Sequence, residues 1–280
     1  MNKRAWGMAA GLLCLLVGCS RQGVVPTEEG SPAGMVSISA RTKTGTDPDS
    51  GAYSLTNAVR FYMDATEVSK TQWDVVYTWA VTNGYSFDYA GSGKAANHPV
   101  QSVNWYDCVK WCNARSEKNG KTPCYTMGTK VYRSGRTLPD CNASATGYRL
   151  PTNTEWEYAA RGGLSDKRFP WGDTIQHSQA NYRSSEAYPY DTNPTRGYHP
   201  TYETDGPPYT SPAGAFAANG YGLYDMAGNV FEWCDDALGS YRLIRGGSWD
   251  YNAFSARCGY SYWVNPEYAD NNYGFRAVCR

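Results

Sequence analysis

The sequence predicts a single compact α+β domain with little regular secondary structure. Among its 280 residues are 29 glycines and 15 prolines, and 15% of the chain is aromatic. This composition favours many short turns and strands with aromatic-lined surfaces, and it disfavours long helices. The length suits one large domain or two small ones, but no internal repeat and no second composition regime divides the chain. We therefore expect one domain over residues 36–280.

Residues 1–18 are typical of an export signal. A basic start (NKR) precedes an apolar stretch at residues 9–17 that is too short to span a bilayer. The stretch ends in LVGC, which resembles a bacterial lipobox, where cleavage before the cysteine leaves that cysteine to carry lipid. We predict lipidation at Cys19. The alternative is an ordinary signal peptide with a chance cysteine.

The residues that follow Cys19 predict a tether and a location. Ser20, rather than an aspartate, comes next, which favours an outer-membrane anchor over an inner-membrane one. Residues 19–35 are rich in Gly, Pro, Ser and Glu, a composition typical of a flexible linker. The prediction is an exported lipoprotein of the bacterial cell envelope that contacts the membrane through its lipid.

The charge balance argues against a nucleic-acid partner. The chain has 26 basic and 26 acidic residues, so its formal net charge is zero. Domains that bind nucleic acid normally carry a basic patch or a basic excess. We therefore expect no nucleic-acid partner.

A strand through Tyr62 and Met63 is predicted to precede the first helix. Ser69, with Gln72 three residues later, fits a capping box, and Gly84 lies past the expected end of the helix. These signals predict a helix between Ser69 and Gly84.

A second helix is predicted between Asn104 as its N-cap and Gly120 as its terminator. Apolar positions at i, i+3, i+4 and i+7 predict a face turned toward the core; they are Trp105, Cys108, Val109 and Cys112. The two cysteines are neighbours on that face, but an i, i+4 pair has poor geometry for a mutual disulfide.

A short third helix is predicted after an excursion of the chain. The excursion runs from Cys124 to Cys141, and a disulfide between them would close a loop of roughly 16 residues and add about 3 kcal/mol of stability. Thr152 and Glu155 then form a second capping box, and a Gly-Gly pair ends the helix. The remainder of the chain is aromatic and turn-rich, and it predicts no further strong helix.

Beyond Cys19 the chain has seven cysteines, namely Cys108, Cys112, Cys124, Cys141, Cys234, Cys258 and Cys279. Because disulfides persist in exported proteins, structural bridges are the default expectation. The odd number predicts at least one free thiol. No C-x-x-C pair occurs, and the three histidines lie far apart in the sequence, so we expect no zinc site.

Seven ordered stretches of the sequence match the motifs of a known family. They are FYMDATEVSKTQW, HPVQSVNWYDCVKWCNARS, GYRLPTNTEWEYAARGG, FPWGD, NGYGLYDMAGNVFEWCDD, RLIRGGSWD and YGFRAV. In this order they resemble the formylglycine-generating enzyme, or sulfatase-modifying-factor, family across essentially the whole mature chain. The resemblance implies a fold related to the C-type lectin fold. The family also includes iron-dependent sulfoxide-synthase domains and many binding members, so the fold does not fix the function.

The resemblance also implies structural calcium. One ligand set comes from the DMAGNVFEW stretch and would be Asp225, Gly228, Val230 and Glu232. Carboxylates that alternate with carbonyls suit a hard cation of flexible coordination. A second possible set consists of Asn181, Tyr182, Asp205 and Pro207. The alternative is that the first set's two carboxylates only cap turns and pair with Arg242 or Arg245.

The copper site that the resemblance implies lacks its ligands in this sequence. The family's enzymes oxidise a sulfatase cysteine to formylglycine with oxygen and copper(I), a soft ion that needs two thiolates. After the Gly-Gly-Ser turn that ends at Ser248, the two cysteine positions hold Tyr251 and Ala256. Cys258 is a single thiol, so we expect no copper site.

A catalytic role for Ser248 would need a base, and no histidine follows His199. Hydrogen bonding inside the turn is the simpler role for this serine.

Two further disulfides are implied by the resemblance. Cys112 matches a family cysteine that pairs near the final GFR motif, which makes Cys279 its expected partner. Cys258 matches a family cysteine whose partner position is Ala160 here, so Cys234 becomes the candidate partner. The remaining cysteine of the second helix would then be the free thiol, buried and inert.

Two functional hypotheses follow. The first is a lipid-anchored, non-catalytic module that binds a peptide or a glycan, because the copper-binding pair is missing. Residues 261–273 (SYWVNPEYADNNY) support it, since aromatics beside Asn and Asp suit stacking on sugars or gripping a peptide; core and turn packing is their alternative role. The second is a sulfatase-maturation oxidoreductase with a different metal arrangement, supported by the family's activity alone.

Overall fold

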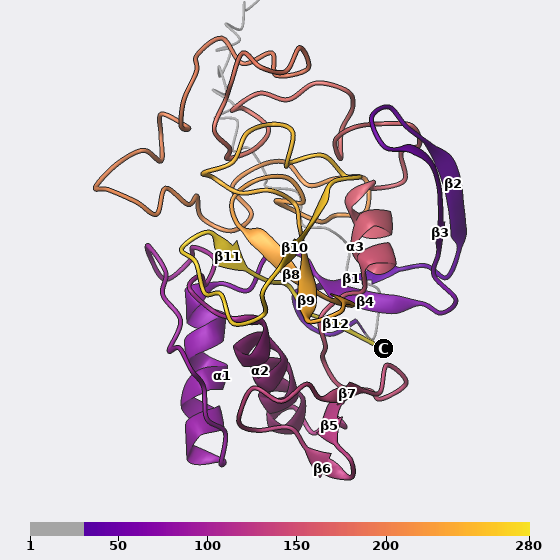
Figure 1. Ribbon diagram of the computed structural model, residues 1–280, viewed down its shortest axis with the longest axis vertical. Coiled ribbons are helices and arrows are strands. Elements are labelled where there is room, and N and C mark those ends of the chain that lie inside the picture. The colour runs from indigo at the N-terminus through magenta and orange to yellow at the C-terminus, as the bar shows by residue number, and fades with distance from the viewer. Residues whose placement is uncertain (1–30) are drawn as a thin grey trace, which may run out of the picture.

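The computed structural model describes residues 31–280, and its helices begin at the N-caps that the sequence predicts (Figure 1). The helices are α1 (Lys70–Thr82), α2 (Trp105–Lys118) and α3 (Asn153–Ala160). Their caps are Ser69, Asn104 and Thr152, and each cap side chain accepts a backbone N–H from the first turn. Both predicted capping boxes, at α1 and α3, are present. The three helix predictions are therefore confirmed.

The expected signal peptide, the lipid-bearing Cys19 and most of the tether lie outside the described residues. β1 (Met35–Ile38) begins one residue before the expected start of the domain. Within residues 31–280, no helix combines the length and the apolar character that a membrane crossing requires.

Within residues 31–280, short strands form four small sheets. The largest has the order β10 (Ser261–Val264), β9 (Tyr241–Arg245), β8 (Phe231–Leu238), β11 (Tyr273–Gly274). A second has the order β1, β4 (Phe61–Asp64), β12 (Val278–Cys279), and a third β6 (Lys130–Val131), β5 (Tyr125–Met127), β7 (Asp140–Cys141). β2 (Thr42–Asp47) and β3 (Gly51–Thr56) form a hairpin. The strand expected through Tyr62 is β4, and the excursion between Cys124 and Cys141 is the third sheet.

The sequence patterns did not predict the β2–β3 hairpin, which packs beside α3 (Figure 1). Between α3 and β8 the chain follows turns and loops over residues 161–230, and in Figure 1 these loops cover the upper part of the molecule. This long irregular segment confirms the low content of regular structure. It also supplies part of the walls of the groove described below.

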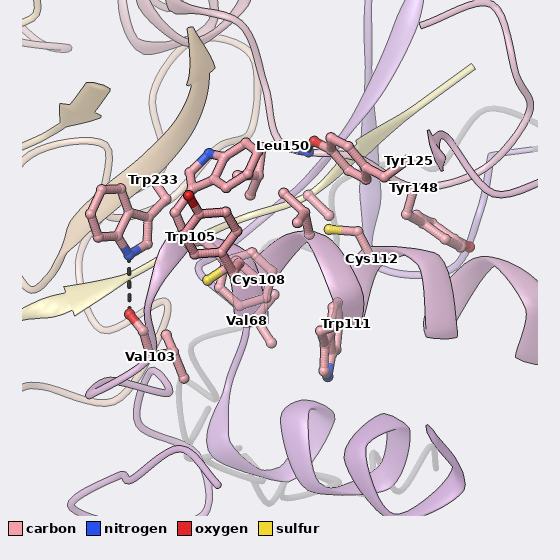
Figure 2. Close-up of a cluster of buried hydrophobic side chains, with 14 of the residues drawn as sticks. Val68, Val103, Trp105, Cys108, Trp111, Cys112, Tyr125, Tyr148, Leu150 and Trp233 are labelled. Atoms are coloured by element: carbon pink, nitrogen blue, oxygen red, sulfur yellow. Dashed lines mark hydrogen bonds between the residues drawn. The ribbon is translucent and has the colours of Figure 1, made fainter. Parts of the chain in front are cut away.

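Large aromatic side chains fill the core between α1, α2 and the C-terminal strands (Figure 2). Trp73 and Trp111 stack at 6.0 Å between ring centroids, and Phe275 meets Trp111 edge-on at 5.2 Å. Trp233 of β8 donates its indole N–H to the carbonyl of Val103 at 3.1 Å. The predicted apolar face of α2 is buried here in full. Aromatic pairs of this kind contribute beyond the area that they bury.

A buried ion pair joins the largest sheet to the C-terminal segment. Arg276 contacts Glu232 of β8 through two bonds, Nε to Oε2 at 2.7 Å and Nη2 to Oε1 at 2.8 Å, and both residues are fully buried. The remaining guanidinium donors reach the carbonyls of Asp64, Ala65 and Tyr224. The alternative that paired Glu232 with Arg242 or Arg245 was therefore wrong. The partner is an arginine in the segment between β11 and β12.

We expect Arg276→Met to destabilise the fold strongly. The substitution leaves the carboxylate of Glu232 buried without its cation, a change that costs roughly 3–5 kcal/mol. Urea denaturation measures the free energy of unfolding. Arg133→Met is the control, because the Arg133 side chain is 42% exposed in its pair with Glu117 and its loss should cost less than about 1 kcal/mol. Equal losses in the two variants would contradict the role of the buried pair.

Candidate binding site

The turn at Gly246, Gly247 and Ser248 has a geometry that depends on its glycines. Both have positive φ, 90° and 75°, and a Cβ at Gly247 would lie 2.9 Å from the backbone nitrogen of Ala256. The turn therefore packs directly on the segment around Ala256. Ser248 is buried, and its hydroxyl accepts a hydrogen bond from the Asn272 side-chain amide at 3.4 Å. This contact supports a structural role for Ser248 inside the turn.

Tyr251 and Ala256 occupy the two positions where the resemblance places copper-binding thiols. Tyr251 is 41% exposed, and its ring meets Phe231 edge-on at 5.0 Å. Ala256 is buried in a small apolar cluster that includes Phe169 and Tyr182. A phenol and a methyl group supply no thiolate, so these residues do not fit copper(I).

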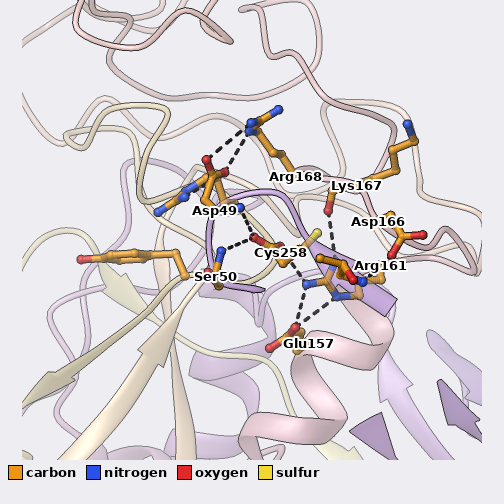
Figure 3. Close-up of polar contacts among 12 residues, drawn as sticks. Asp49, Ser50, Glu157, Arg161, Asp166, Lys167, Arg168 and Cys258 are labelled. Atoms are coloured by element: carbon orange, nitrogen blue, oxygen red, sulfur yellow. Dashed lines mark hydrogen bonds and ion pairs between the residues drawn. The ribbon is translucent and has the colours of Figure 1, made fainter. Parts of the chain in front are cut away.

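Cys258 does not replace the missing thiols. Its side chain is fully buried, and burial raises the pKa of Cys258 to about 12. Its backbone N–H donates to the carbonyl of Arg168 at 2.7 Å. Figure 3 shows the residue between the hairpin tip, at Asp49 and Ser50, and Arg161. A thiol held protonated in this way is a poor nucleophile and a poor metal ligand at neutral pH.

All seven cysteines within residues 31–280 are free thiols in the structure. Cys124 lies next to Cys141, because Tyr125 of β5 pairs with Cys141 of β7. Cys108, the expected odd thiol, is buried on α2, and burial raises its pKa well above the ordinary value. The three disulfides themselves stay predictions.

The tip of the β2–β3 hairpin is clamped onto the body of the domain. Asp47 Oδ1 accepts the backbone N–H groups of Asp49 at 3.1 Å and Ser50 at 3.0 Å. Its Oδ2 accepts Arg161 Nη2 at 2.9 Å, and the same nitrogen donates to Glu157 at 2.8 Å. Both side chains of the Asp47–Arg161 pair are buried. The tip is therefore held in one position over the chain at Cys258.

Asp49, at the tip, lies between two arginines that come from distant parts of the chain. Its carboxylate is 2.9 Å from Arg168 Nε and 2.9 Å from Arg257 Nη1. Burial raises the pKa of Asp49, but hydrogen bonds from Arg257 and Arg168 outweigh it, so the pKa lies below the ordinary value. The carboxylate is thus ionised at neutral pH, and two cations share one anion.

An open hollow of about 740 Å³ lies against this tip. Aromatic rings line it together with the charged pair; they are Tyr188, Tyr190, Phe254 and Tyr260. Tyr188 stacks on Tyr190 with 5.5 Å between centroids, and Phe254 lies 5.6 Å from Tyr188. A neighbouring hollow of about 430 Å³ shares Asp49 and Tyr190 with the first. We call the two hollows together the aromatic groove.

The aromatic stretch predicted as a binding surface divides into exposed and buried rings. Tyr262 and Tyr268 are exposed, while Tyr273 packs in the core against Trp233 at 5.5 Å. Burial and then the nearby charges of Asp250, Asp270 and Tyr262 raise the pKa of Tyr251. Tyr262 lies on β10, whose Ser261 borders the groove.

The first predicted calcium set is incomplete in this geometry. Both oxygens of Glu232 already accept hydrogen bonds from Arg276, and one of them also accepts the indole N–H of Trp156 at 2.7 Å. Asp225 offers one oxygen, since its other oxygen accepts the N–H of Gly214. The carbonyl-bearing members, Gly228 and Val230, are buried in the same loop. Glu232 therefore does not fit as a calcium ligand.

The second predicted calcium set fits in part. The side-chain oxygen of Asn181 is buried and has no partner, as a ligand oxygen would. The carbonyl of Tyr182 lies 3.0 Å from Nε2 of His177, and Asp205 and Pro207 stand on an exposed loop. Within the described part of the chain, no group of three or more His, Cys, Asp or Glu side chains is placed to hold a metal ion. Calcium binding stays a prediction, and Asn181 is the residue that fits it best.

Two buried carboxyl groups face each other beside Arg276. Glu67 and Asp225 are fully buried or nearly so, and three of their four oxygens have no hydrogen-bond partner when both groups are ionised. Burial, and then the charge of Asp225, raises the pKa of Glu67 well above its ordinary value. Burial likewise raises the pKa of Asp225 to about 6. One proton shared between the two groups gives both carboxyl groups a hydrogen bond.

Comparison with known proteins identifies the scaffold. Residues 21–280 match the model of the sulfatase-modifying factor enzyme 1-like domain. The formylglycine-generating enzyme of Mus musculus is 32% identical over 78% of this chain and 65% of its own length. Chaperone protein LppX of Paenibacillus barcinonensis is 32% identical over 71% of this chain and 73% of its own. Serine/threonine-protein kinase pkn1 of Chlamydia caviae is 37% identical over 65% of this chain, which spans 24% of that protein.

Solved structures share the fold. The Treponema denticola variable protein 1 superposes with a TM-score of 0.67 and 26% identity, over 88% of this chain and 94% of that one. CarF superposes with a TM-score of 0.69 and 26% identity, over 89% and 98%. These similarities confirm the predicted α+β fold of the formylglycine-generating enzymes, related to the C-type lectin fold.

We expect Glu67→Gln to increase stability at alkaline pH and to flatten its dependence on pH. In the wild type the folded state keeps a proton on Glu67 that the unfolded chain releases near pH 4, because burial and then the charge of Asp225 raise the pKa of Glu67 well above its ordinary value. That contribution is complete below pH 4 and is lost as the pH rises through the raised pKa of Glu67. The amide of Gln donates its hydrogen bond at every pH. Between pH 5 and pH 8 the variant should gain on the order of 2 kcal/mol relative to the wild type.

Urea unfolding at several pH values, with EGTA present throughout, measures this difference. Glu267→Gln serves as the control, since the Glu267 side chain is 50% exposed and its substitution should leave the pH dependence unchanged. Parallel pH curves for wild type and Glu67→Gln would rule out the shared proton.

Proposed function

This chain belongs to the sulfatase-modifying factor family, and we propose that it serves there as a ligand-binding module and not as a copper oxidase. The observation that carries this proposal is the open aromatic groove beside a turn whose two thiol positions hold Tyr251 and Ala256. Without two thiolates the copper-dependent step has no metal centre. What remains beside that turn is a concave surface of rings and fixed charges, which suits binding.

The groove borders β10, a strand that carries a further exposed ring. Tyr260 lines the groove and lies edge-on to Phe254 at 5.1 Å, while Tyr262, two residues further, is exposed on β10. Tyr side chains present large, rigid faces with a polar tip, so they bind partners at low entropic cost. We propose that a glycan or a peptide lies on this surface.

The names of similar proteins support a broader role for the domain than oxidation. One relative is named a chaperone protein and another a protein kinase, and the chain spans only a quarter of the length of the latter. The domain thus occurs within proteins named for different activities. A binding role for the scaffold is consistent with that range.

We propose in addition that the module is displayed on the bacterial cell envelope as a lipoprotein anchored at Cys19. The lipobox-like LVGC sequence supports this placement. Incorporation of radiolabelled fatty acid into the full chain, and its loss in Cys19→Ser, tests the anchor. Equal labelling of both chains would refute it.

We expect the full chain, purified in detergent, to bind members of a glycan or peptide array through the groove. Tyr190→Ala should weaken that binding at least about tenfold, because the ring lines both hollows and an aromatic contact of this kind contributes about 1.4 kcal/mol or more. Tyr241→Ala is the control, since Tyr241 is exposed at the start of β9. Binding curves for the three proteins give the comparison.

A second assay separates the module from the oxidase. A peptide with the sulfatase C-x-P-x-R motif, incubated with the chain, copper(I) and oxygen, should keep its thiol. Appearance of the aldehyde by mass spectrometry would overturn the proposal in favour of a sulfatase-maturation oxidoreductase.

A further inference from the structure

We propose that the aromatic groove recognises an acidic saccharide, with Arg168 and Arg257 as the subsite for its carboxylate or sulfate group. This inference rests on the proposed binding function and specifies the class of ligand. Three features of the groove carry it: an uncompensated positive charge, guanidinium groups held in fixed planes, and flat ring faces beside them. Figure 3 shows Arg168 beside Asp49.

The positive charge follows from a count of the ionised groups around the tip. Arg168 and Arg257 share one carboxylate, Asp49. The other charged groups nearby face an equal number of opposite charges: Asp47 and Glu157 face Arg161 and Arg245, Asp173 faces Lys167, and Asp166 faces Lys43. One positive charge therefore remains at the groove, and an anionic ligand neutralises it.

Donor atoms are available for that anion. Within the described residues, Arg257 uses Nε on the carbonyl of Phe254 and Nη1 on Asp49, so its Nη2 has no partner. Arg168 uses Nε and Nη2 on Asp49, so its Nη1 has none. Each guanidinium thus keeps a terminal nitrogen for a ligand oxygen. Arginine pairs with carboxylate and sulfate groups through such planar N–H donors.

Both arginines are held in place by aromatic rings of the groove. The guanidinium of Arg257 lies 4.0 Å from the centroid of Phe254, and that of Arg168 lies 5.1 Å from the centroid of Tyr190. Stacking of this kind fixes the plane of each guanidinium before a ligand arrives. Less rotational entropy is then lost on binding.

The rest of the groove favours a sugar over a peptide chain. Its hollows are wide, and they are lined by ring faces with the hydroxyl-bearing Ser50 and Ser261 at their borders. The backbone N–H groups of Asp49 and Ser50 are already bound to Asp47, so the tip offers no backbone donors for strand pairing with a peptide. Sugar rings need flat apolar faces and side-chain hydrogen bonds, and both are present.

An array with four kinds of probe tests the inference. The probes are uronate, sialylated and sulfated oligosaccharides, their neutral counterparts, acidic peptides and neutral peptides, and the full chain in detergent is applied at two salt concentrations. We expect binding to acidic saccharides that weakens as salt rises. Arg168→Gln should reduce it at least tenfold, and Arg133→Gln, which removes an arginine elsewhere on the surface, should leave it unchanged.

Asp49→Asn is expected to increase the affinity, a result that misfolding of the variant cannot produce. It removes the carboxylate that competes with the ligand for both arginines, so affinity for the acidic saccharide should rise severalfold. Binding to neutral sugars or to peptides alone would overturn this inference while the proposed binding function stands. Binding to none of the probes would overturn both. Unchanged or lower affinity in Asp49→Asn, with an intact melting transition, would also refute the arginine subsite.

Discussion

The buried ion pair between Arg276 and Glu232 is the interaction on which the rest of this structure depends. It joins β8 to the end of the chain and also holds the carbonyl of Asp64, 212 positions earlier in the sequence. The backbone ladders between the same segments are short, because β11 pairs with β8 and β12 pairs with β4 over two residues each. A guanidinium with several acceptors around it reinforces them, and the desolvation of both ions makes any alternative arrangement costly. The turn and the groove are built on the sheet that this pair anchors.

The scaffold can keep its geometry while the site changes, because different residues form the two. The two glycines that shape the turn are present, and Gly247 still packs on Ala256. The side chains that the turn presents, however, are a half-exposed phenol and a buried methyl group. Cys258 cannot compensate, since the clamped hairpin tip covers it and burial keeps its pKa near 12. The fold therefore persists without the two thiols that copper(I) requires.

Local patterns in the sequence predicted the helices, because local forces determine where a helix starts and which face it buries. Each helix starts at its predicted cap because the capping hydrogen bonds join residues three apart, and the apolar face of α2 follows from helical periodicity alone. The partner of Glu232 was missed because it lies 44 positions away and no short-range pattern distinguishes one arginine from another. The aromatic groove was missed for the same reason. Its walls come from the hairpin tip, the long irregular segment and the residues around Phe254, which only the folded chain brings together.

Asp49 holds both arginines of the groove in fixed positions. Without it, the two guanidinium groups would repel each other, and only their ring contacts and the Arg257 bond to the Phe254 carbonyl would hold them. With it, both are drawn to one point and held against Tyr190 and Phe254, so the groove keeps its shape when empty. The same carboxylate repels an anionic ligand, which limits affinity. A site arranged in this way is preorganised, but its affinity for anions is reduced. It favours ligands that make ring contacts as well as charge contacts over small anions, which offer charge alone.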